Sequence, residues 1–221
     1  MELWKAMEQR HSVRAYRDVP LAEEAVAALQ ACIDACNREG GLHIQLVRNE
    51  PKAFDCRMAH YGRFSGVRNY IALIGRKGPK LEEACGYYGE RIVLEAQRLG
   101  LNSCWVAMSY KKIPEAYRVD EGEKLTVVIA LGYGADEGVP HKSKSPEAVS
   151  RVAGEAPEWF VRGVRAALLA PTAMNQQKFC FALDDRRVSA RPGVGFYSEI
   201  DLGIAKYHFE IGAGRENFEW A

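Results

Sequence analysis

The sequence predicts an α+β fold in which two pseudo-repeated halves, about residues 1–150 and 151–221, interlock as one unit. Two observations lead to this prediction. Apolar residues recur at helical spacing in several segments, whereas runs such as 70–74 and 126–131 have the length and composition of strands. A helix–strand–helix order also occurs early in the chain and again after Pro157, which suggests an internal duplication. Chance similarity between amphipathic helices is the alternative explanation of the repeat.

The apolar pattern gives each element in turn. Helices are predicted over residues 2–9, from 20 to the glycine pair 40–41, and over 80–99, 157–170 and 201–211. Strands are predicted over 43–47, 70–74, 102–106, 126–131 and 178–183, and residues 49–68 are not assigned. The stripe expected to be buried in the second helix is Val26, Leu29, Ile33 and Cys36. In the third helix, Gly86 and Gly89 suggest close approach by a ligand or another backbone, because glycine weakens a helix.

The overall charge excludes several kinds of partner. The chain has 30 basic and 29 acidic residues, so its net charge of +1 gives no long-range attraction to nucleic acid or anionic lipid. No apolar run is long enough to span a bilayer, and the first residues lack the apolar core of a signal peptide. We therefore expect a cytoplasmic protein. The six cysteines form no CxxC pair and no metal site is predicted.

The segment Arg10-His11-Ser12-Val13-Arg14 is the first candidate for ligand binding. Alternate residues of an extended chain point the same way, so Arg10, Ser12 and Arg14 could converge on one anion. A guanidinium group offers a planar fork of donors that suits phosphate. A solvated basic loop is the simpler interpretation when this segment is taken alone.

Two further polar segments lie later in the chain. Residues 170–177, Ala-Pro-Thr-Ala-Met-Asn-Gln-Gln, place three amides between a helix and a strand, and amides match the mixed donor and acceptor edge of a flavin or purine. A polar connecting loop is the alternative. Lys142 and Lys144 follow Gly132-Tyr133-Gly134, but the glycine spacing is wrong for a Rossmann phosphate loop. The two lysines could still supply phosphate charge, and a flexible charged linker is the alternative.

The sequence contains no nucleophile–base motif. GxSxG, HExxH and Walker A patterns are missing, and Cys104 lies in an apolar strand where a core role is expected. Polar ligand-binding groups without an acid, base or nucleophile are typical of chemistry that a cofactor carries.

Together these segments resemble the FMN-dependent nitroreductase superfamily. RHSVR is similar to its opening phosphate motif, and YYGERIVLEAQRLGLNSCWV to its long central helix and following strand. VVIALGYGADEGVPHKSK resembles its basic phosphate segment, and APTAMNQQKF resembles its Asn/Gln flavin motif. In most of the superfamily the Asn/Gln motif comes early, whereas here it follows the basic segment. The order resembles a small subfamily with two nitroreductase-like halves in one chain.

The resemblance implies a mixed sheet flanked by helices and one FMN held between the two halves. The residues implied in cofactor binding are Arg10, His11, Ser12, Arg14, Ala107, Met108, Lys142, Lys144, Pro171, Thr172, Ala173, Asn175 and Gln177. Arg10, Ser12, Lys142 and Lys144 would hold the phosphate, with His11 nearby. Arg14 would lie near flavin N1 and O2, backbone groups of Ala107 and Met108 near N5, and residues 171–177 over the ring.

The implied activity is electron transfer from NAD(P)H, a transient hydride donor, through FMN to a small-molecule acceptor such as a nitroaromatic or a quinone. No residue is predicted to be catalytic by itself. The chain is expected to be a monomer that mimics a dimer, or a weak homodimer. Reductive dehalogenation, breakdown of flavin, and non-catalytic FMN binding or sensing are the alternatives, because one fold supports many functions.

Overall fold

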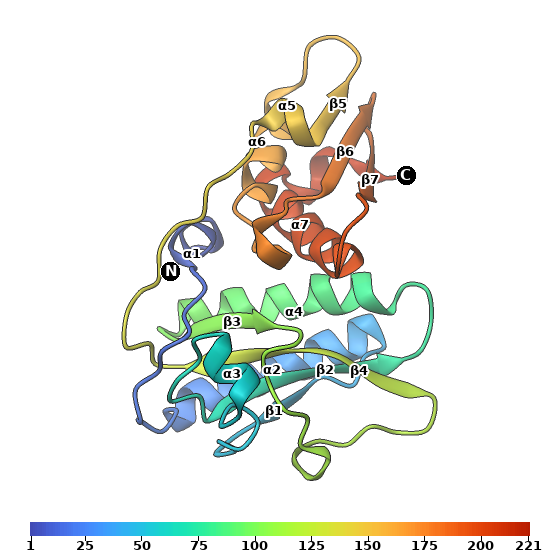
Figure 1. Cartoon of the computed structure of the whole chain (residues 1–221). Helices are drawn as coiled ribbons and strands as arrows, with labels where there is room; N and C mark the ends of the chain where they lie inside the picture. Colours follow the sequence, from blue (N-terminus) through green and yellow to red (C-terminus); the bar gives the residue numbers. More distant parts are fainter. The chain divides into compact units, whose positions relative to one another are not determined.

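A computed structural model describes all residues from Met1 to Ala221 and confirms the α+β fold (Figure 1). The chain divides into two compact units. Unit 1 contains Met1–Gln9, Glu82–Glu90 and His141–Ala221, and unit 2 contains Arg10–Leu81 and Arg91–Pro140. The units are therefore not consecutive stretches of sequence. The predicted halves concern an internal duplication, which stays a prediction.

Unit 2 is built on an antiparallel four-stranded sheet with the order β1-β2-β4-β3. Its strands are β1 (Gln45–Val47), β2 (Asn69–Arg76), β3 (Asn102–Val106) and β4 (Glu123–Gly132). Seven of the eight residues of β2 are buried, as the continuous apolar run predicted for a central strand. Helices α2 (Glu23–Gly40) and α3 (Arg57–Tyr61), the short 3-10 turn Pro114–Ala116, and the second half of α4 (Leu81–Arg98) complete the unit.

Unit 1 is built on a mixed four-stranded sheet with the order β5-β6-β7-β8. Its strands are β5 (Ser150–Val152), β6 (Phe179–Asp184), β7 (Arg187–Pro192) and β8 (Glu219–Trp220). Its helices are α1 (Leu3–Gln9), α5 (Pro146–Val149), α6 (Glu158–Ala167) and α7 (Ser198–Ala213), with 3-10 turns at Ala173–Asn175 and Arg215–Asn217. The first half of α4 also belongs to this unit.

Two details of the sequence prediction need correction. The buried stripe of α2 is Ala25, Leu29, Ile33 and Cys36, while Val26 is only half-buried. Four-residue steps from Leu29 lead back to Ala25, which places Val26 at the side of the helix. In the predicted helix over 157–170, the spacing of Val161, Val164 and Leu168 predicts a buried stripe, but Val161 of α6 is half-buried and Phe160 takes the core position one residue earlier. The sequence analysis also did not predict β5, β7, β8, α3 or α5.

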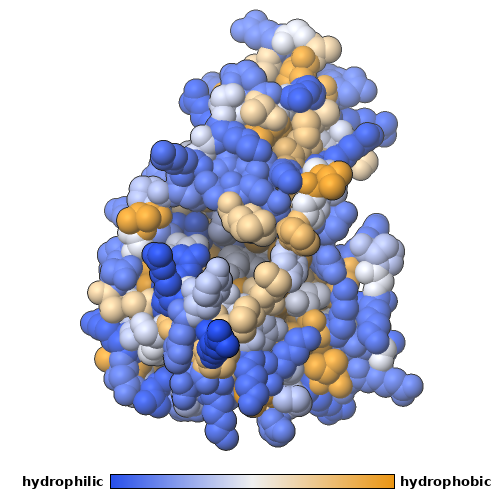
Figure 2. Space-filling model, in the orientation of Figure 1, coloured by the Kyte–Doolittle hydropathy of each residue, from blue (hydrophilic) through white to orange (hydrophobic).

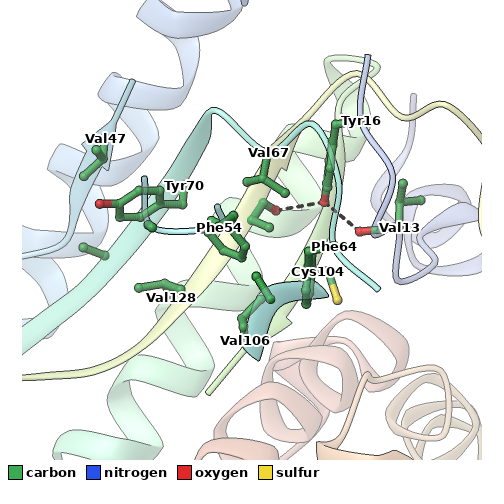
Figure 3. Close-up of a cluster of buried hydrophobic side chains, with 14 of the residues drawn as sticks. Val13, Tyr16, Val47, Phe54, Phe64, Val67, Tyr70, Cys104, Val106 and Val128 are labelled. Carbon is green, nitrogen blue, oxygen red and sulfur yellow. Dashed lines mark hydrogen bonds between the residues drawn. The ribbon is translucent and has the colours of Figure 1, made fainter. Parts of the chain in front are cut away.

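A core cluster fills unit 2 and includes the segment that the sequence did not assign (Figure 3). Ala53, Phe54, Ala59 and Phe64 from this segment pack with residues of β2, β3 and β4. The rings of Phe54 and Phe64 meet edge to face with centroids 5.2 Å apart. Val67 is buried in the same cluster, so the polar composition of residues 49–68 conceals five buried side chains.

The surface is mainly hydrophilic on the face that Figure 2 shows, with hydrophobic residues in small scattered groups. Among the large apolar side chains that are exposed are Met58, Tyr61, Met108, Met174, Val194 and Phe196. None of the helices combines the length and apolar character needed to cross a membrane.

Candidate functional site

The N-terminal segment 12–17 is fixed by backbone pairing within unit 2. Ser12 forms a parallel bridge with Ser103 of β3, and the Val13 amide donates to the Ser103 carbonyl at 3.1 Å. Tyr16 then pairs with Gly134, so the segment continues along the turn after β4. The buried Tyr16 hydroxyl donates to the Val13 carbonyl at 2.8 Å and lies 3.3 Å from the Ala130 carbonyl (Figure 3). These contacts hold the segment in the extended form that its alternating pattern requires.

Arg10, Ser12 and Arg14 all interact with the thiol of Cys104 in β3. Burial raises the pKa of Cys104, while the charge of Arg14, a hydrogen bond with Ser12 and the charge of Arg10 act in the opposite direction. Three side chains at alternate positions of the segment therefore influence the pKa of the same thiol. Arg10 is only 3% exposed, whereas Ser12 is half-buried and Arg14 is exposed. Cys104 itself is a core residue, as the sequence predicted.

Arg14 and His11 are positioned by neighbouring loops. The Arg14 guanidinium lies 5.9 Å from the centroid of the Phe64 ring, and its carbonyl accepts from the Ser65 amide at 3.0 Å. His11 Nδ1 donates to the Glu137 carbonyl at 3.0 Å. The donors near Cys104 are two guanidinium groups and one hydroxyl, a set whose chemistry suits an anion with several oxygens.

Ala107 and Met108 lie in the bend that follows β3. Ala107 is half-buried, while Met108 is 69% exposed. The end of α3 touches this bend, because a Cβ at Gly62 would lie 2.7 Å from Ser109 Cβ. Tyr61 at the end of α3 is 85% exposed. Two neighbouring segments of unit 2, the end of α3 and the bend after β3, therefore each carry an exposed apolar side chain.

The two later polar motifs come together within unit 1. Gln177 Nε2 donates to the Lys142 carbonyl at 2.7 Å, and Gln177 Oε1 accepts from the Lys144 amide at 2.8 Å. Asn175 Nδ2 also donates to the Lys142 carbonyl, at 2.8 Å. The Lys144 ammonium donates to the carbonyls of Gln176 and Gln177. The sequence identified both motifs but did not predict that they bind each other.

These hydrogen bonds within the chain occupy side-chain groups that the sequence analysis assigned to ligand binding. Gln177 is 2% exposed, and both ends of its amide bond to the chain. Thr172 Oγ1 accepts a hydrogen bond from the backbone N–H of Gln177 at 3.0 Å. Pro171 is buried, Thr172 and Ala173 are half-buried, and Lys142 is exposed. The residues near Cys104 and those of this loop belong to different units, and a role for both groups in binding one cofactor stays a prediction.

The loop from Thr172 to Gln177 has an unusual backbone. Met174, Asn175 and Gln177 have φ values of 51°, 53° and 43°. Asparagine tolerates this left-handed conformation, but methionine and glutamine adopt it rarely. Such strain persists only where surrounding contacts enforce it, and it occurs often at functional sites. The Lys142 and Lys144 contacts are part of that enforcement.

Asp201, in the first turn of α7, makes the other contacts that hold the loop in this strained conformation. The sequence analysis did not identify it. Its carboxylate is 3% exposed and accepts from the Ala173 amide at 2.9 Å and from Gln176 Nε2 at 2.7 Å. The only signal in the sequence is an acidic residue at the predicted start of a helix, which is common on helices that face solvent. Burial raises the pKa of Asp201 to about 6, although both hydrogen bonds act to lower it.

We expect Asp201 to make the stability of the protein depend on pH. Because its folded-state pKa is raised, its contribution to stability is complete below about pH 4 and is lost as the pH rises through about 6. The loss corresponds to roughly 3 kcal/mol. Urea unfolding from pH 4 to pH 8 should show this fall in the native protein and not in Asp201→Asn. Parallel curves for the two proteins would contradict the assignment.

A third group of polar side chains lies at one end of the sheet of unit 2. Ligand atoms of His43, Asp120 and Glu123 fall within 4.8 Å of one another. His43 Nδ1 is 2.8 Å from Glu123 Oε2, and the Arg118 guanidinium pairs with Asp120. These pairings within the chain explain why the three side chains lie close together.

Several solved structures share the fold. A protein from Thermotoga maritima MSB8, described as a "putative nitroreductase", is 22% identical with a TM-score of 0.68, and the match covers 98% of this chain and 85% of that one. A protein from Desulfovibrio desulfuricans, described as a "putative nitroreductase" in complex with FMN, is 20% identical with a TM-score of 0.53, and the match covers 71% of this chain and 98% of that one. A protein described as an NADH dehydrogenase/NAD(P)H nitroreductase, from Parabacteroides distasonis ATCC 8503, is 21% identical with a TM-score of 0.54 over 66% and 95%. At these identities the likeness shows the fold.

No curated protein matches the chain significantly. The family model described as "Putative TM nitroreductase" matches residues 2–213, which is nearly the whole chain. The α+β architecture agrees with this match. The chain therefore belongs to that nitroreductase family.

Proposed function

We propose that the protein is an FMN-dependent oxidoreductase that passes electrons from NAD(P)H to a nitroaromatic, a quinone or a similar acceptor. Membership of the nitroreductase family supports the general class. The Desulfovibrio desulfuricans structure with the same fold is described as a complex with FMN, and the Parabacteroides distasonis protein as an NAD(P)H nitroreductase. These descriptions motivate the choice of cofactor and electron donor.

The observation that carries the proposal is the buried Arg10, which lies in one segment with Ser12 and Arg14 beside the bridge between Ser12 and Ser103. Arg10 is buried, and a buried cation is costly unless an anion or several hydrogen bonds compensate it. With Ser12 and Arg14 it forms a set rich in donors, which fits a phosphate group. A terminal phosphate is the part of FMN that such a set would recognise.

The residues of unit 2 have distinct roles in this proposal. Arg10 and Ser12 bind the phosphate, and His11 supports the turn beside them through Glu137. The exposed Arg14 guanidinium would supply a positive charge beside the flavin and so would favour its reduction. Backbone groups of Ala107 and Met108 would bind the flavin near the atom that accepts hydride. Bound FMN supplies the capacity to accept a hydride and to return electrons.

The exposed apolar side chains of α3 and the bend after β3 support a flat acceptor. Tyr61 and Met108 are 85% and 69% exposed, and their segments touch at Gly62 and Ser109. Aromatic and thioether side chains pack well against planar, electron-poor rings. Nitroaromatics and quinones have this shape.

We expect Arg10→Ala and Arg14→Ala to weaken FMN binding in different ways. Each charge-assisted contact contributes about 1.5–3 kcal/mol, which corresponds to a roughly 10- to 150-fold increase in Kd. Arg14→Ala should also lower the midpoint potential of the bound cofactor, whereas Arg10→Ala should leave it nearly unchanged. Fluorescence titration and anaerobic potentiometry measure the two effects.

Arg17→Ala is the matched control for these variants. Arg17 is exposed and lies over the Tyr133 ring at 5.6 Å, outside the donor group. Its removal should leave both Kd and potential unchanged. Full cofactor occupancy in Arg10→Ala and Arg14→Ala would show that the site lies elsewhere.

The experiment that tests the function is the visible absorption spectrum of the purified protein before and after anaerobic addition of NADH or NADPH. A flavin spectrum that bleaches, and recovers when a nitroaromatic or quinone is added, supports the proposal. A flavin spectrum that persists favours a binding or sensing role. A protein that takes up no FMN would refute the cofactor assignment.

A further inference from the structure

The carboxylate of Asp201 lies between two donors of the loop that the sequence analysis assigned to the flavin. Its Oδ1 accepts a hydrogen bond from the backbone N–H of Ala173 at 2.9 Å, and its Oδ2 accepts one from Gln176 Nε2 at 2.7 Å. Asp201 is only 3% exposed, so these donors, and not water, satisfy the carboxylate. One buried acid on α7 thus joins the start of the loop to its end.

The Gln176 side chain extends this contact to the segment before α7. Its Nε2 also donates to the Phe196 carbonyl at 2.8 Å. Its Oε1 lies against Gly195, since a Cβ built on that residue would be 2.3 Å from Oε1. If the amide turned over, Nε2 would lose both of its acceptors. The orientation of the Gln176 amide is therefore fixed by Asp201 and Phe196 together.

Both contacts of Asp201 require an ionised carboxylate. A carboxylate only accepts hydrogen bonds, whereas a protonated acid or an amide carries a donor on one of its two terminal atoms. The Ala173 N–H is a backbone donor, and Gln176 Nε2 is committed to Phe196 as a donor, so neither can become an acceptor. Asp201→Asn has almost the same shape, but one of its two contacts would set a donor against a donor. The amide variant is therefore a specific probe of these contacts.

The backbone between the two donors is strained. Met174 and Asn175 have φ values of 51° and 53° and lie between the residues that Asp201 binds. A methionine rarely adopts this conformation, which persists only where surrounding contacts enforce it. The other side of the loop is held at the Lys142 carbonyl, which accepts from Asn175 Nδ2. Without Asp201 the loop loses its contact at Ala173, and Met174 can relax to an ordinary backbone conformation.

We propose that Asp201 is a positioning residue that holds residues 173–176 in the conformation that binds FMN. This rests on the proposed function, in which residues 171–177 cover the flavin ring. A loop that is already ordered loses little conformational entropy when a ligand binds, whereas a relaxed loop must be ordered first. Asp201 thus acts on cofactor affinity through Ala173 and Gln176 and has no need to touch the flavin.

The charge on Asp201 makes FMN binding depend on pH. Burial raises the pKa of Asp201 to about 6, and the other groups that act on this pKa are the Gln176 amide and the Ala173 N–H, neither of which is charged. Below this pH the protonated acid sets a donor against a donor and the loop loses a contact. Affinity is therefore expected to be complete above about pH 7 and to fall as the pH drops through about 6.

The test is a titration of the full-length protein with FMN, followed by flavin fluorescence, at about pH 7.5 and about pH 5. Asp201→Asn should raise the Kd about tenfold at the higher pH, because it removes a charge-assisted hydrogen bond. Acidification should remove most of the difference between the native protein and Asp201→Asn. The phosphate of FMN also titrates at about pH 6, but it affects both proteins alike, so their ratio of Kd values isolates Asp201.

Glu199→Gln is the matched control. It removes the other acidic side chain from the first turn of α7 and leaves both loop contacts in place. Its Kd should equal that of the native protein at both pH values. Amide hydrogen exchange without FMN reports on the loop itself, and the peptide that contains Ala173 should exchange about tenfold faster in Asp201→Asn and at the native rate in Glu199→Gln.

The two measurements separate the possible failures. Faster exchange in Asp201→Asn with an unchanged Kd would overturn the proposal, because the loop would relax without any effect on the cofactor. Unchanged exchange would show that Asp201 does not hold the loop. A ratio of Kd values that stays the same at both pH values would exclude the carboxylate charge as the cause. A native protein that takes up no FMN would refute the proposed function, and the role of Asp201 in cofactor binding with it.

Discussion

Glu90→Ala is expected to lower the free energy of unfolding by about 3–5 kcal/mol, because it breaks a fully buried polar pair. Glu90 on α4 and His208 on α7 are both 0% exposed, and His208 Nε2 is 2.9 Å from Glu90 Oε1. His208 Nδ1 is 3.1 Å from the Ala166 carbonyl of α6, so this nitrogen carries a proton. Removal of Glu90 leaves His208 Nε2 buried without the carboxylate that it contacts.

Two control variants separate the pair from the general loss of a side chain. Glu90→Gln keeps the shape and one polar contact to His208, so its cost should be much smaller than that of Glu90→Ala. Glu23→Ala removes an ion pair with Arg48 from a carboxylate that is 82% exposed, and should cost less than about 1 kcal/mol. Urea unfolding at pH 7 measures all three. Similar losses for Glu90→Ala and Glu23→Ala would contradict the burial argument.

Gly203→Ala is expected to destabilise the protein by about 3 kcal/mol or more through a clash between two helices. A Cβ at Gly203 of α7 would lie 2.0 Å from the Glu83 carbonyl oxygen and 2.7 Å from the Tyr87 nitrogen, both in α4. Gly86 makes the reciprocal contact, since a Cβ there would lie 2.1 Å from the Ile200 carbonyl oxygen. The obstacle is backbone on both sides, so neither helix can yield by turning a side chain.

The sign of the Gly203→Ala effect is diagnostic. Alanine favours an exposed helix over glycine by about 1 kcal/mol, so the same change would stabilise α7 if the helices did not touch. Gly78→Ala is the control, because nothing lies within 4 Å of its added Cβ, and it should change stability by less than about 0.5 kcal/mol. Thermal and urea unfolding measure both. A stabilised Gly203→Ala protein would refute the close crossing.

Much of this fold could be predicted because the signals are local. The run 70–74 is buried, and so are the apolar stripes of α2 and α6 apart from Val26 and Val161, so the main helices and central strands follow from the sequence. The suggestion that Gly86 marks close approach by another backbone is confirmed by its contact with Ile200. The partner could not be predicted, because the two residues are far apart in the chain.

The missed elements depend on tertiary contacts. Strand β7 has a half-buried pattern with arginines at both exposed positions, which resembles a loop. The two-residue strand β8 exists because the Glu219 amide donates to the Arg186 carbonyl and its residues pair with Arg187 and Val188. A stretch of two residues carries no periodicity from which to infer a strand.

In the candidate site, too, local features could be predicted from the sequence, whereas features that depend on tertiary contacts could not. Alternation within residues 10–14 predicted that Arg10, Ser12 and Arg14 would share one side, and this follows from local geometry. Their position beside Cys104 depends on pairing between Ser12 and Ser103, which are 91 residues apart in sequence. Asp201 was missed because an acid in the first turn of a helix has the same sequence pattern whether it faces solvent or a buried loop.

The division of α4 between the two units bears on how the chain folds as it is synthesised. Every residue of unit 2 has been made once position 140 is reached, whereas unit 1 needs α7, which ends at Ala213. Unit 2 can therefore fold while Glu82–Glu90 of α4 still waits for its partner helix. During that interval the carboxylate of Glu90 and the backbone at Gly86 face water. A polar side chain that is buried in the finished unit would then help to keep the emerging intermediate soluble.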